Sequence, residues 1–383
     1  KRMKKIIITA IILLLVFSVF ACSNTGNQQN TASAQSSGGV GATAAISSAT
    51  PSASAAATKS GPVSPTTGLP GNTLYRPIQV QIDNEATGRP QYGIQDADIV
   101  YEAEIEPDAT RLSAIFNDTL PTKVGPVRSA RVYFQWIENE WDSIFVHDGG
   151  ANNKASTYSY VGSAENGGDM KKNIDAGKGV PENIMWGGGV KPTWANLQAV
   201  EETYGYKQTP RSPLFKFDQN VDYSKYPSFS KVDIPFRGTS PGGDHQVSYT
   251  YDKSTDLLTR YNFGNPFLAG DTGKVVTVQN LIVQYVEESD IMDGATHQLL
   301  GLINNKGKAE FFVGGKHMTG TWSKKDRHAA TIFKLDDGSE LVLKPGNTWF
   351  ALQRNTNTIT VTDASGTTAS ASASASATSS SNN

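Results

Sequence analysis

The stretch Lys123-Val124-Gly125-Pro126-Val127-Arg128-Ser129-Ala130-Arg131 places two arginines three residues apart, behind a Gly-Pro turn. Apolar residues recur at helical spacing over 132–141, which predicts a helix with Ser129 as its N-cap. Free backbone N–H groups at a helix start, beside two arginine side chains, predict a site for an anion. The alternative is that the arginines serve the fold through salt bridges to Asp83, Glu85 or Glu102.

Strand patterns surround this stretch. Alternating apolar residues predict strands at 78–82, 99–105 and 110–116, and a fourth strand at 143–147 ends in polar and glycine residues. A further helix is expected to begin near Thr193. Because strands and helices follow one another here, we expect residues 74–208 to form a mixed α/β domain.

Polar side chains on these strands complete the candidate site. Two carboxylates share one face of the second strand, which fits a solvated face or half of an acid pair or metal site. The neighbouring His147 and Asp148 point to opposite strand faces, so a direct catalytic pair is not expected, and no catalytic residue is assigned. The candidate ligand-binding residues are Asp83, Asn84, Glu102, Arg111, Arg128 and Arg131.

The second half of the chain has a different pattern. A proline-rich connector over 209–241 leads into strand patterns over 242–362, and glycine-containing turns at 314–315 and 336–338 predict hairpins. The expected fold class is α+β or α/β, with an N-terminal mixed α/β domain followed by a β-rich domain. Residues 363–383 are rich in Ser and Ala and predict a disordered tail.

The first 22 residues resemble a lipoprotein signal peptide. Four basic residues precede an apolar run over 6–20, which is too short to span about 30 Å of hydrocarbon. Cys22 is the only cysteine and follows Val19-Phe20-Ala21 as in a lipobox, so we expect cleavage before it and a diacylglyceryl (palmitate-type) membrane anchor on its thiol. An ordinary signal peptide with an unrelated cysteine is the alternative. Residues 23–73 predict a disordered Ser/Thr/Ala tether.

Composition limits the partners. Without the four basic residues of the leader, the formal net charge changes from −2 to −6, which argues against a nucleic-acid partner. Scattered histidines and a single cysteine do not predict a zinc site, and no glycine-rich nucleotide motif is present, so neither metal nor cofactor is expected. We expect the protein on the outer face of the cytoplasmic membrane.

Several motifs together resemble the YerB-like lipoprotein family. They are Arg76-Pro77, Asp83-Asn84, Arg89-Pro90-Gln91, 97–102, Thr110-Arg111-Leu112, 125–131, Gly320-Thr321-Trp322 and 344–349. The resemblance implies an extracytoplasmic lipoprotein with a two-part domain of unknown function, an α/β first part and a β-rich second part. Departures at 104–109, at Trp186-Gly187 and at 192–196 imply that a family site there would be altered.

Three functions remain open from the sequence. The first is a binding module for an anionic envelope ligand, such as a wall-polymer phosphate, a lipid pyrophosphate or a peptide carboxylate. The second is a metal-assisted phosphoryl-transfer or hydrolytic enzyme, which alone would need a divalent cation. The third is a scaffold that recruits envelope-synthesis proteins.

Overall fold

The computed structural model describes residues 61–106, 109–150, 173–205, 213–236, 246–290 and 298–372. The predicted signal peptide, Cys22 and residues 23–60 of the predicted tether lie outside the described residues, as does the tail from 373 on. All described residues belong to one contact-defined unit, Lys59–Asn383. None of the helices within these ranges is long and apolar enough to cross a bilayer.

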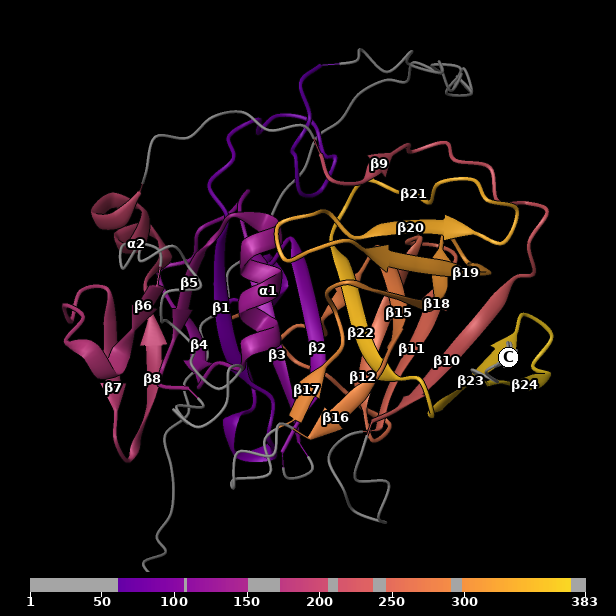
Figure 1. Ribbon diagram of the computed structural model, residues 1–383. Helices are drawn as coiled ribbons and strands as arrows, with labels where there is room; N and C mark the ends of the chain where they lie inside the picture. Colours follow the sequence, from indigo (N-terminus) through magenta and orange to yellow (C-terminus); the bar gives the residue numbers. More distant parts are fainter. Residues whose placement is uncertain are drawn as a thin grey trace, which may run out of the picture. The chain divides into compact units, whose positions relative to one another are not determined.

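A thirteen-stranded sheet is the centre of the described structure (Figure 1). Its neighbours in order are β20 (Ile332–Leu335), β19 (Lys316–Lys324), β18 (Asn305–Val313), β15 (Asn280–Val286), β22 (Thr348–Arg354), β2 (Ile99–Ile105), β3 (Ala109–Phe116), β1 (Ile78–Asp83), β4 (Val124–Val127), β8 (Lys191–Ala195) and β7 (Met185–Gly188), while β5 (Ile144–His147) pairs with β1 and with β6 (Asn173–Asp175).

The two halves of the sequence meet inside this sheet. Strand β22 lies parallel to β2, with Ile99 opposite Thr348 and Glu102 opposite Ala351. Strands from both sides of the predicted connector over 209–241 therefore share one sheet, and strand β10 (Phe229–Pro235) lies within that connector. Strands β1, β2 and β3 are buried along their whole length, so both of their faces are covered.

A seven-stranded sheet forms the second layer. Its strands are β13 (Asn265–Pro266), β12 (Leu257–Asn262), β11 (Gln246–Asp252), β10 (Phe229–Pro235), β23 (Thr358–Asp363) and β24 (Thr368–Ser372), with β14 (Thr277–Val278) on β12. Two small ribbons, β16 (Glu288–Asp290) with β17 (Gln298–Leu300) and β9 (Lys216–Phe217) with β21 (Val342–Leu343), complete the described strands.

Two hydrophobic clusters lie on the two faces of the larger sheet. One cluster joins side chains of β1, such as Val80, to side chains of the smaller sheet, such as Val232. The other cluster joins the opposite face of β2, including Ile99 and Tyr101, to helix α1 (Val132–Trp141). Helix α2 (Leu197–Tyr204) packs into the first cluster. The period-two pattern of β2 thus separates its two faces as the alternation predicts.

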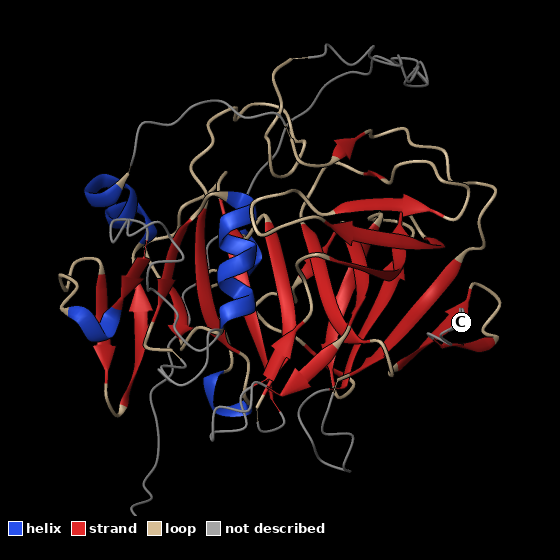
Figure 2. Cartoon of the chain, in the orientation of Figure 1, coloured by secondary structure: helices blue, strands red, loops and turns tan. Residues whose placement is uncertain are grey.

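The predicted mixed α/β class is wrong. The described chain is mostly β-sheet, with α1 and α2 as its two α-helices (Figure 2). The α/β class was expected because strand and helix patterns follow one another in the first half of the sequence, as they do where helices cover a sheet. Here the smaller β-sheet covers one face, and its strands are supplied by Phe229 and later residues.

Both ends of the described structure extend past the predicted borders. Residues 61–73 were expected within the disordered tether, but Ser64, Thr66 and Thr67 are buried. Their hydroxyl groups donate hydrogen bonds to Asp98 and Asp118, which holds this segment on the fold. At the other end β24 pairs with β23 inside the predicted tail, because Ser, Ala and Thr can extend a sheet edge through backbone hydrogen bonds.

Candidate functional site

Arg128 follows β4 and pairs with Asp83, the last residue of β1. Its Nε donates to Asp83 Oδ2 at 2.7 Å, and this bond raises the pKa of the guanidinium above its ordinary value. The main chain of Arg128 is held from both sides, by Gln81 O and by the N–H of Asp148. The Arg128 side chain is 50% exposed, whereas that of Asp83 is 2% exposed. The terminal nitrogens of Arg128 bond to none of the described residues.

A cavity of about 250 Å³ lies beside this pair. The β7–β8 hairpin forms the facing wall and contributes Lys191 and Thr193. Asp148 also lines the cavity and accepts a hydrogen bond from the Thr193 hydroxyl. The charged lining therefore consists of two basic and two acidic side chains, namely Arg128, Lys191, Asp83 and Asp148.

Arg111 and Arg131 do not line this cavity. Arg111 lies on β3, is 4% exposed, and donates from Nη1 to the Ser129 carbonyl at 2.7 Å. Burial, and then repulsion from Arg131, lowers the pKa of Arg111 to about 10. Arg131 pairs with Glu106 and also donates to the Ala130 carbonyl at 2.9 Å. Both arginines are thus engaged by groups of the protein itself.

The predicted helix-terminus site is wrong in its geometry. Helix α1 begins at Val132 with Arg131 at its N-cap position, and no side chain caps it. Ser129 instead lies ahead of the helix, where its side chain is within 3.2 Å of Arg111 Nη1. Arg128 and Arg131 therefore do not share a first helical turn. The extended segment before Val132 directs the two arginines to separate carboxylates, Asp83 and Glu106.

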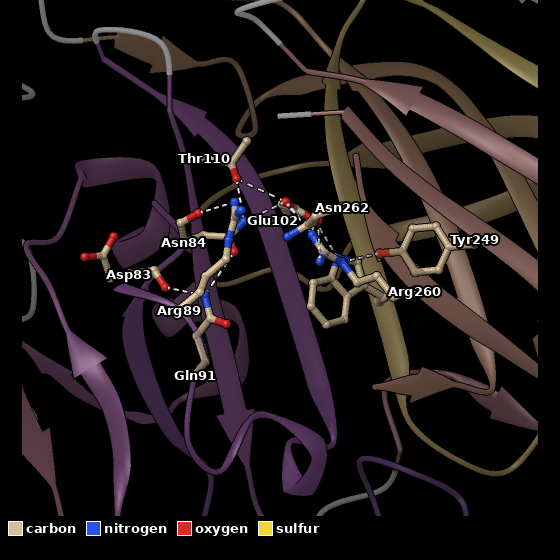
Figure 3. Close-up of polar contacts among 10 residues, drawn as sticks. Asp83, Asn84, Arg89, Gln91, Glu102, Thr110, Tyr249, Arg260 and Asn262 are labelled. Atoms are coloured by element: carbon tan, nitrogen blue, oxygen red, sulfur yellow. Dashed lines mark hydrogen bonds and ion pairs between the residues drawn. The ribbon is translucent and has the colours of Figure 1, made fainter. Parts of the chain in front are cut away.

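Glu102 and Asn84 belong to a buried network between the two sheets (Figure 3). Glu102 accepts from Arg260 Nη2 at 2.9 and 3.0 Å, and both side chains are 0% exposed. Asn84 donates to Glu102 Oε1 at 3.0 Å, and the Trp349 indole donates to Oε2 at 3.1 Å. Burial is the largest single effect and lowers the pKa of Arg260, but Glu102 and Tyr249 together outweigh it and raise this pKa above its ordinary value. This pair is a structural contact that joins β2 to β12.

Sequence reasoning missed Arg260 and Lys191. A signal for Arg260 was present, because Leu258, Arg260 and Asn262 alternate on the buried face of β12. A charged residue on the inward face of a strand indicates a buried partner. For Lys191 the sequence offers no comparable signal, because its place beside Arg128 depends on the pairing of β8 with β4.

The described residues contain no group of three His, Cys, Asp or Glu side chains that could hold a metal ion. Glu102 is bound to Arg260, and Glu104 is bound to Arg354 at 2.7 Å. His147 is held by the Gly149 carbonyl at 2.7 Å and by Asn173. Glu102 and Glu104, the two carboxylates that share one face of β2, are thus each paired with an arginine.

Comparison with known proteins gives matches along most of this fold. Residues 66–186 match the family described as "Protein of unknown function (DUF3048) N-terminal domain", and residues 237–350 match the DUF3048 C-terminal domain. "Putative lipoprotein YerB" of Bacillus subtilis (strain 168) is 31% identical over 284 residues, which are 72% of this chain and 81% of that protein. The crystal structure of YerB protein from Bacillus subtilis superposes with a TM-score of 0.64 at 29% identity, over 76% of this chain and 96% of that one. The resemblance drawn from the motifs is confirmed.

Proposed function

We propose a binding function for this chain, which belongs to the YerB-like family of proteins with DUF3048 N- and C-terminal domains. The ligand is an anionic group of the cell envelope, and the site is the cavity beside Arg128. The candidate bound groups are a wall-polymer phosphate, a lipid pyrophosphate and a peptide carboxylate. The protein acts as a binding or accessory module, and no chemical step is assigned to it.

The proposal rests on the contacts and the exposure of the Arg128 side chain. Its Nε is anchored on Asp83, its half-exposed side chain lines the cavity, and its terminal nitrogens bond to none of the described residues. A guanidinium held at one edge keeps two donors free for a bidentate contact with a carboxylate or phosphate. Lys191 on the facing hairpin adds a second positive charge. Of the three predicted arginines, Arg128 is the one in position to meet a ligand.

The charges of the cavity favour a ligand group with a single negative charge. Asp83 and Asp148 balance Arg128 and Lys191, so the lining as a whole is neutral. A pyrophosphate would bring two or more negative charges close to both carboxylates and would be repelled. A phosphodiester or a terminal carboxylate carries one charge and fits the arginine side of the cavity. We therefore rank these two above a lipid pyrophosphate.

The proposed location follows from the leader and from the relative. Residues 1–22 have the pattern of a lipoprotein signal peptide with Cys22 as the acylated residue, and the Bacillus subtilis relative is named as a lipoprotein. We propose a diacylglyceryl anchor in the outer face of the cytoplasmic membrane. The predicted tether from 23 to about 60 then separates the fold from the lipid surface.

Retention on purified cell walls tests the proposed function. The wild-type chain should be retained, and Arg128→Gln should be lost from the wall fraction while its circular dichroism spectrum is unchanged. The matched control is Lys253→Gln, which removes a positive charge from an exposed turn that does not line the cavity. Walls stripped of phosphodiester-linked polymers by hydrofluoric acid separate the two ligands, because peptide carboxylates survive this treatment. Equal retention of wild type and Arg128→Gln on both wall samples would refute the proposal.

A further inference from the structure

A pocket of about 470 Å³ lies on the smaller sheet, over strands β10, β11 and β23. Side chains alternate between the two faces of a strand, and Val232 and Val247 belong to the core between the sheets. Their neighbours Asp233 and Ser248 therefore lie on the opposite face, where they line the pocket. The pocket is thus on the side of the smaller sheet that is turned away from the larger one, and it is larger than the cavity beside Arg128.

A row of polar side chains crosses the pocket. Asp233 lies opposite Ser248 of β11 and opposite Thr360 of β23. Ser248 is 8% exposed and lines the pocket, so a ligand can reach it from there. The hydroxyl groups of Ser248 and Thr360 and the amide group of Gln246 make no hydrogen bond to any of the described residues. These three groups are therefore available to a ligand in the pocket.

The charges of the pocket cancel. Lys231 Nζ lies 2.6 Å from Asp233 Oδ1, and the two side chains are 42% and 41% exposed. Every other residue that lines the pocket is neutral. The second carboxylate oxygen, Asp233 Oδ2, remains available as an acceptor. An anion near Lys231 would also meet Asp233, so the lining favours a neutral ligand.

Phe263 lines the pocket from the turn between β12 and β13. Phe263 and Gly264 are the two central residues of this turn, with φ angles of 48° and 72°. Asn-Gly is the favoured sequence in such a turn, because a bulky side chain is strained at positive φ. Phe263 is partly exposed, and its ring contacts no other aromatic ring in the described part of the chain. Strained residues are concentrated at binding sites, so this conformation indicates that the ring contacts a ligand.

A ligand on this face has side chains, and not the backbone, to bind. Strand β10 is paired with β11 on one side and with β23 on the other, so its backbone groups are used within the sheet and cannot pair with an extended peptide. A sugar ring has an apolar C–H face and a rim of hydroxyl groups, each of which can donate and accept. The C–H face matches an aromatic ring, and the hydroxyl groups match the carboxylate, hydroxyl and amide groups of the pocket.

We propose that this pocket binds a neutral sugar ring, which packs on Phe263 and hydrogen-bonds to Asp233, Ser248 and Gln246. The volume lies within the range of about 300 to 1,000 Å³ that is typical of sites for small ligands. The pocket shares no lining residue with the cavity beside Arg128, and this inference does not depend on the anion-binding proposal. A protein with both sites recognises sugar units in addition to an anionic group.

The probes for this pocket are neutral trisaccharides of glucose, of galactose and of N-acetylglucosamine, titrated into the full-length chain in lipid nanodiscs. We expect calorimetry to show saturable binding of at least one of them, with a Kd of about 1 mM or tighter. A blocked tripeptide of alanine and leucine should not compete with the sugar. If none of the trisaccharides binds, or if the tripeptide displaces the bound sugar, the proposal is overturned.

Phe263→Asn separates a binding role from a structural role. Asparagine is favoured at this position of the turn, so the urea midpoint should stay level or rise, whereas the affinity for the sugar should fall about tenfold or more. Leu268→Asn is the matched control, because Leu268 is 43% exposed and lines a neighbouring pocket instead. This control and Arg128→Gln should both leave the affinity unchanged.

Ser248→Ala tests the same pocket without changing the turn. It removes one hydroxyl group and should weaken sugar binding about three- to tenfold. Wild-type affinity in Ser248→Ala and Phe263→Asn would overturn the proposal. An equal loss of affinity in Leu268→Asn would also overturn it, because the sugar would then lie in the neighbouring pocket.

Discussion

Two arginine–carboxylate pairs have their carboxylate on the larger sheet and differ in what surrounds them. Arg260 and Glu102 are both 0% exposed, and Glu102 receives further hydrogen bonds from Asn84 and Trp349. Arg128 and Asp83 meet at a similar distance, but the arginine is half exposed and faces a cavity. The first pair holds β12 of the smaller sheet on β2. In the second pair the terminal N–H groups of Arg128 donate to none of the described residues. Distance alone therefore does not distinguish a structural pair from a ligand site.

The difference arises from the second layer of the fold. The smaller β-sheet covers β2 at Glu102 and excludes water there, so an unpaired charge at this position would be costly. At the end of β1 the facing element is the β7–β8 hairpin, and a cavity remains between them. Water, or a ligand in its place, can reach Arg128. The same chemical pair is thus closed to water under the second sheet and open to it beside the hairpin, where we propose that it serves recognition.

The largest effect is expected for the buried pair. Arg260→Met leaves Glu102 without its cation in a site closed to water and should lower the free energy of unfolding by about 3 to 5 kcal/mol. Urea unfolding followed by circular dichroism measures this loss. The double variant Arg260→Met/Glu102→Gln should recover part of it, because the uncompensated charge is removed. A loss below about 1 kcal/mol for the single variant would contradict the structural role of this pair.

Asp98 is a buried carboxyl group that has no arginine partner among the described residues, in contrast to Glu102. Asp98 is 4% exposed, and burial, with repulsion from Asp118, raises its pKa from the ordinary value of 3.8 to about 8. Because the folded-state pKa is the higher one, its contribution to stability is present at low pH and is lost as pH rises from about 4 to about 8. Asp98→Asn can keep the acceptor for the N–H groups of Asn117 and Asp118. In this variant the free energy of unfolding should decrease less between about pH 4 and about pH 8 than in the wild type.

Urea midpoints at pH 5 and pH 8 test this expectation. The wild-type midpoint should fall between the two values by more than that of Asp98→Asn. The exposed Asp222→Asn is the control and should keep the wild-type difference. Equal differences for wild type and Asp98→Asn would mean that Asp98 does not titrate with a raised pKa.

A smaller effect is expected in the cavity beside Arg128 and Asp83. Asp148→Asn keeps an acceptor for the Thr193 hydroxyl and removes one negative charge from the cavity. The affinity for a singly charged anion should rise about two- to fivefold, and the gain should shrink as salt is added. Titration with N-acetyl-D-alanine at two salt concentrations measures both. An unchanged or lower affinity at low salt would place the anion away from Asp148.

The sequence predicted local features of the fold better than it predicted the layers. The strands near 78–82, 99–105 and 110–116 and the faces of β2 follow from period-two alternation, which is a local property. The pairing of β2 with β22 joins residues about 250 positions apart, and no local pattern shows it. For this reason buried strands were assigned to an α/β domain although a β-sheet covers them.

In the candidate site, too, the local features were predicted and the long-range contacts were not. The sequence singled out Arg128 and named Asp83 as an alternative partner, and these two residues do pair. It also included Arg111 of a neighbouring strand, and it grouped Arg131 with Arg128 because a helix was expected to begin at Ser129. The helix begins at Val132, so that grouping does not hold. Lys191 and Arg260 reach their positions through strand pairing and were not among the predicted residues.

A comparison of Arg128→Gln with Arg131→Gln, two identical changes three residues apart, tests most directly whether Arg128 binds an anion in the cavity. For each variant and the wild type, urea unfolding and the binding of phosphate and N-acetyl-D-alanine are measured together. Arg128→Gln should weaken binding about tenfold or more and change the free energy of unfolding by about 1 kcal/mol or less, since the side chain is half exposed and glutamine can still donate to Asp83.

Arg131→Gln should show the opposite behaviour. It removes the cation from a nearly buried pair with Glu106 and should lower the free energy of unfolding by about 3 kcal/mol while leaving the affinity for both anions unchanged. If Arg128→Gln is the variant that loses stability and retains binding, Arg128 belongs to the scaffold, and the central claim about the cavity is contradicted.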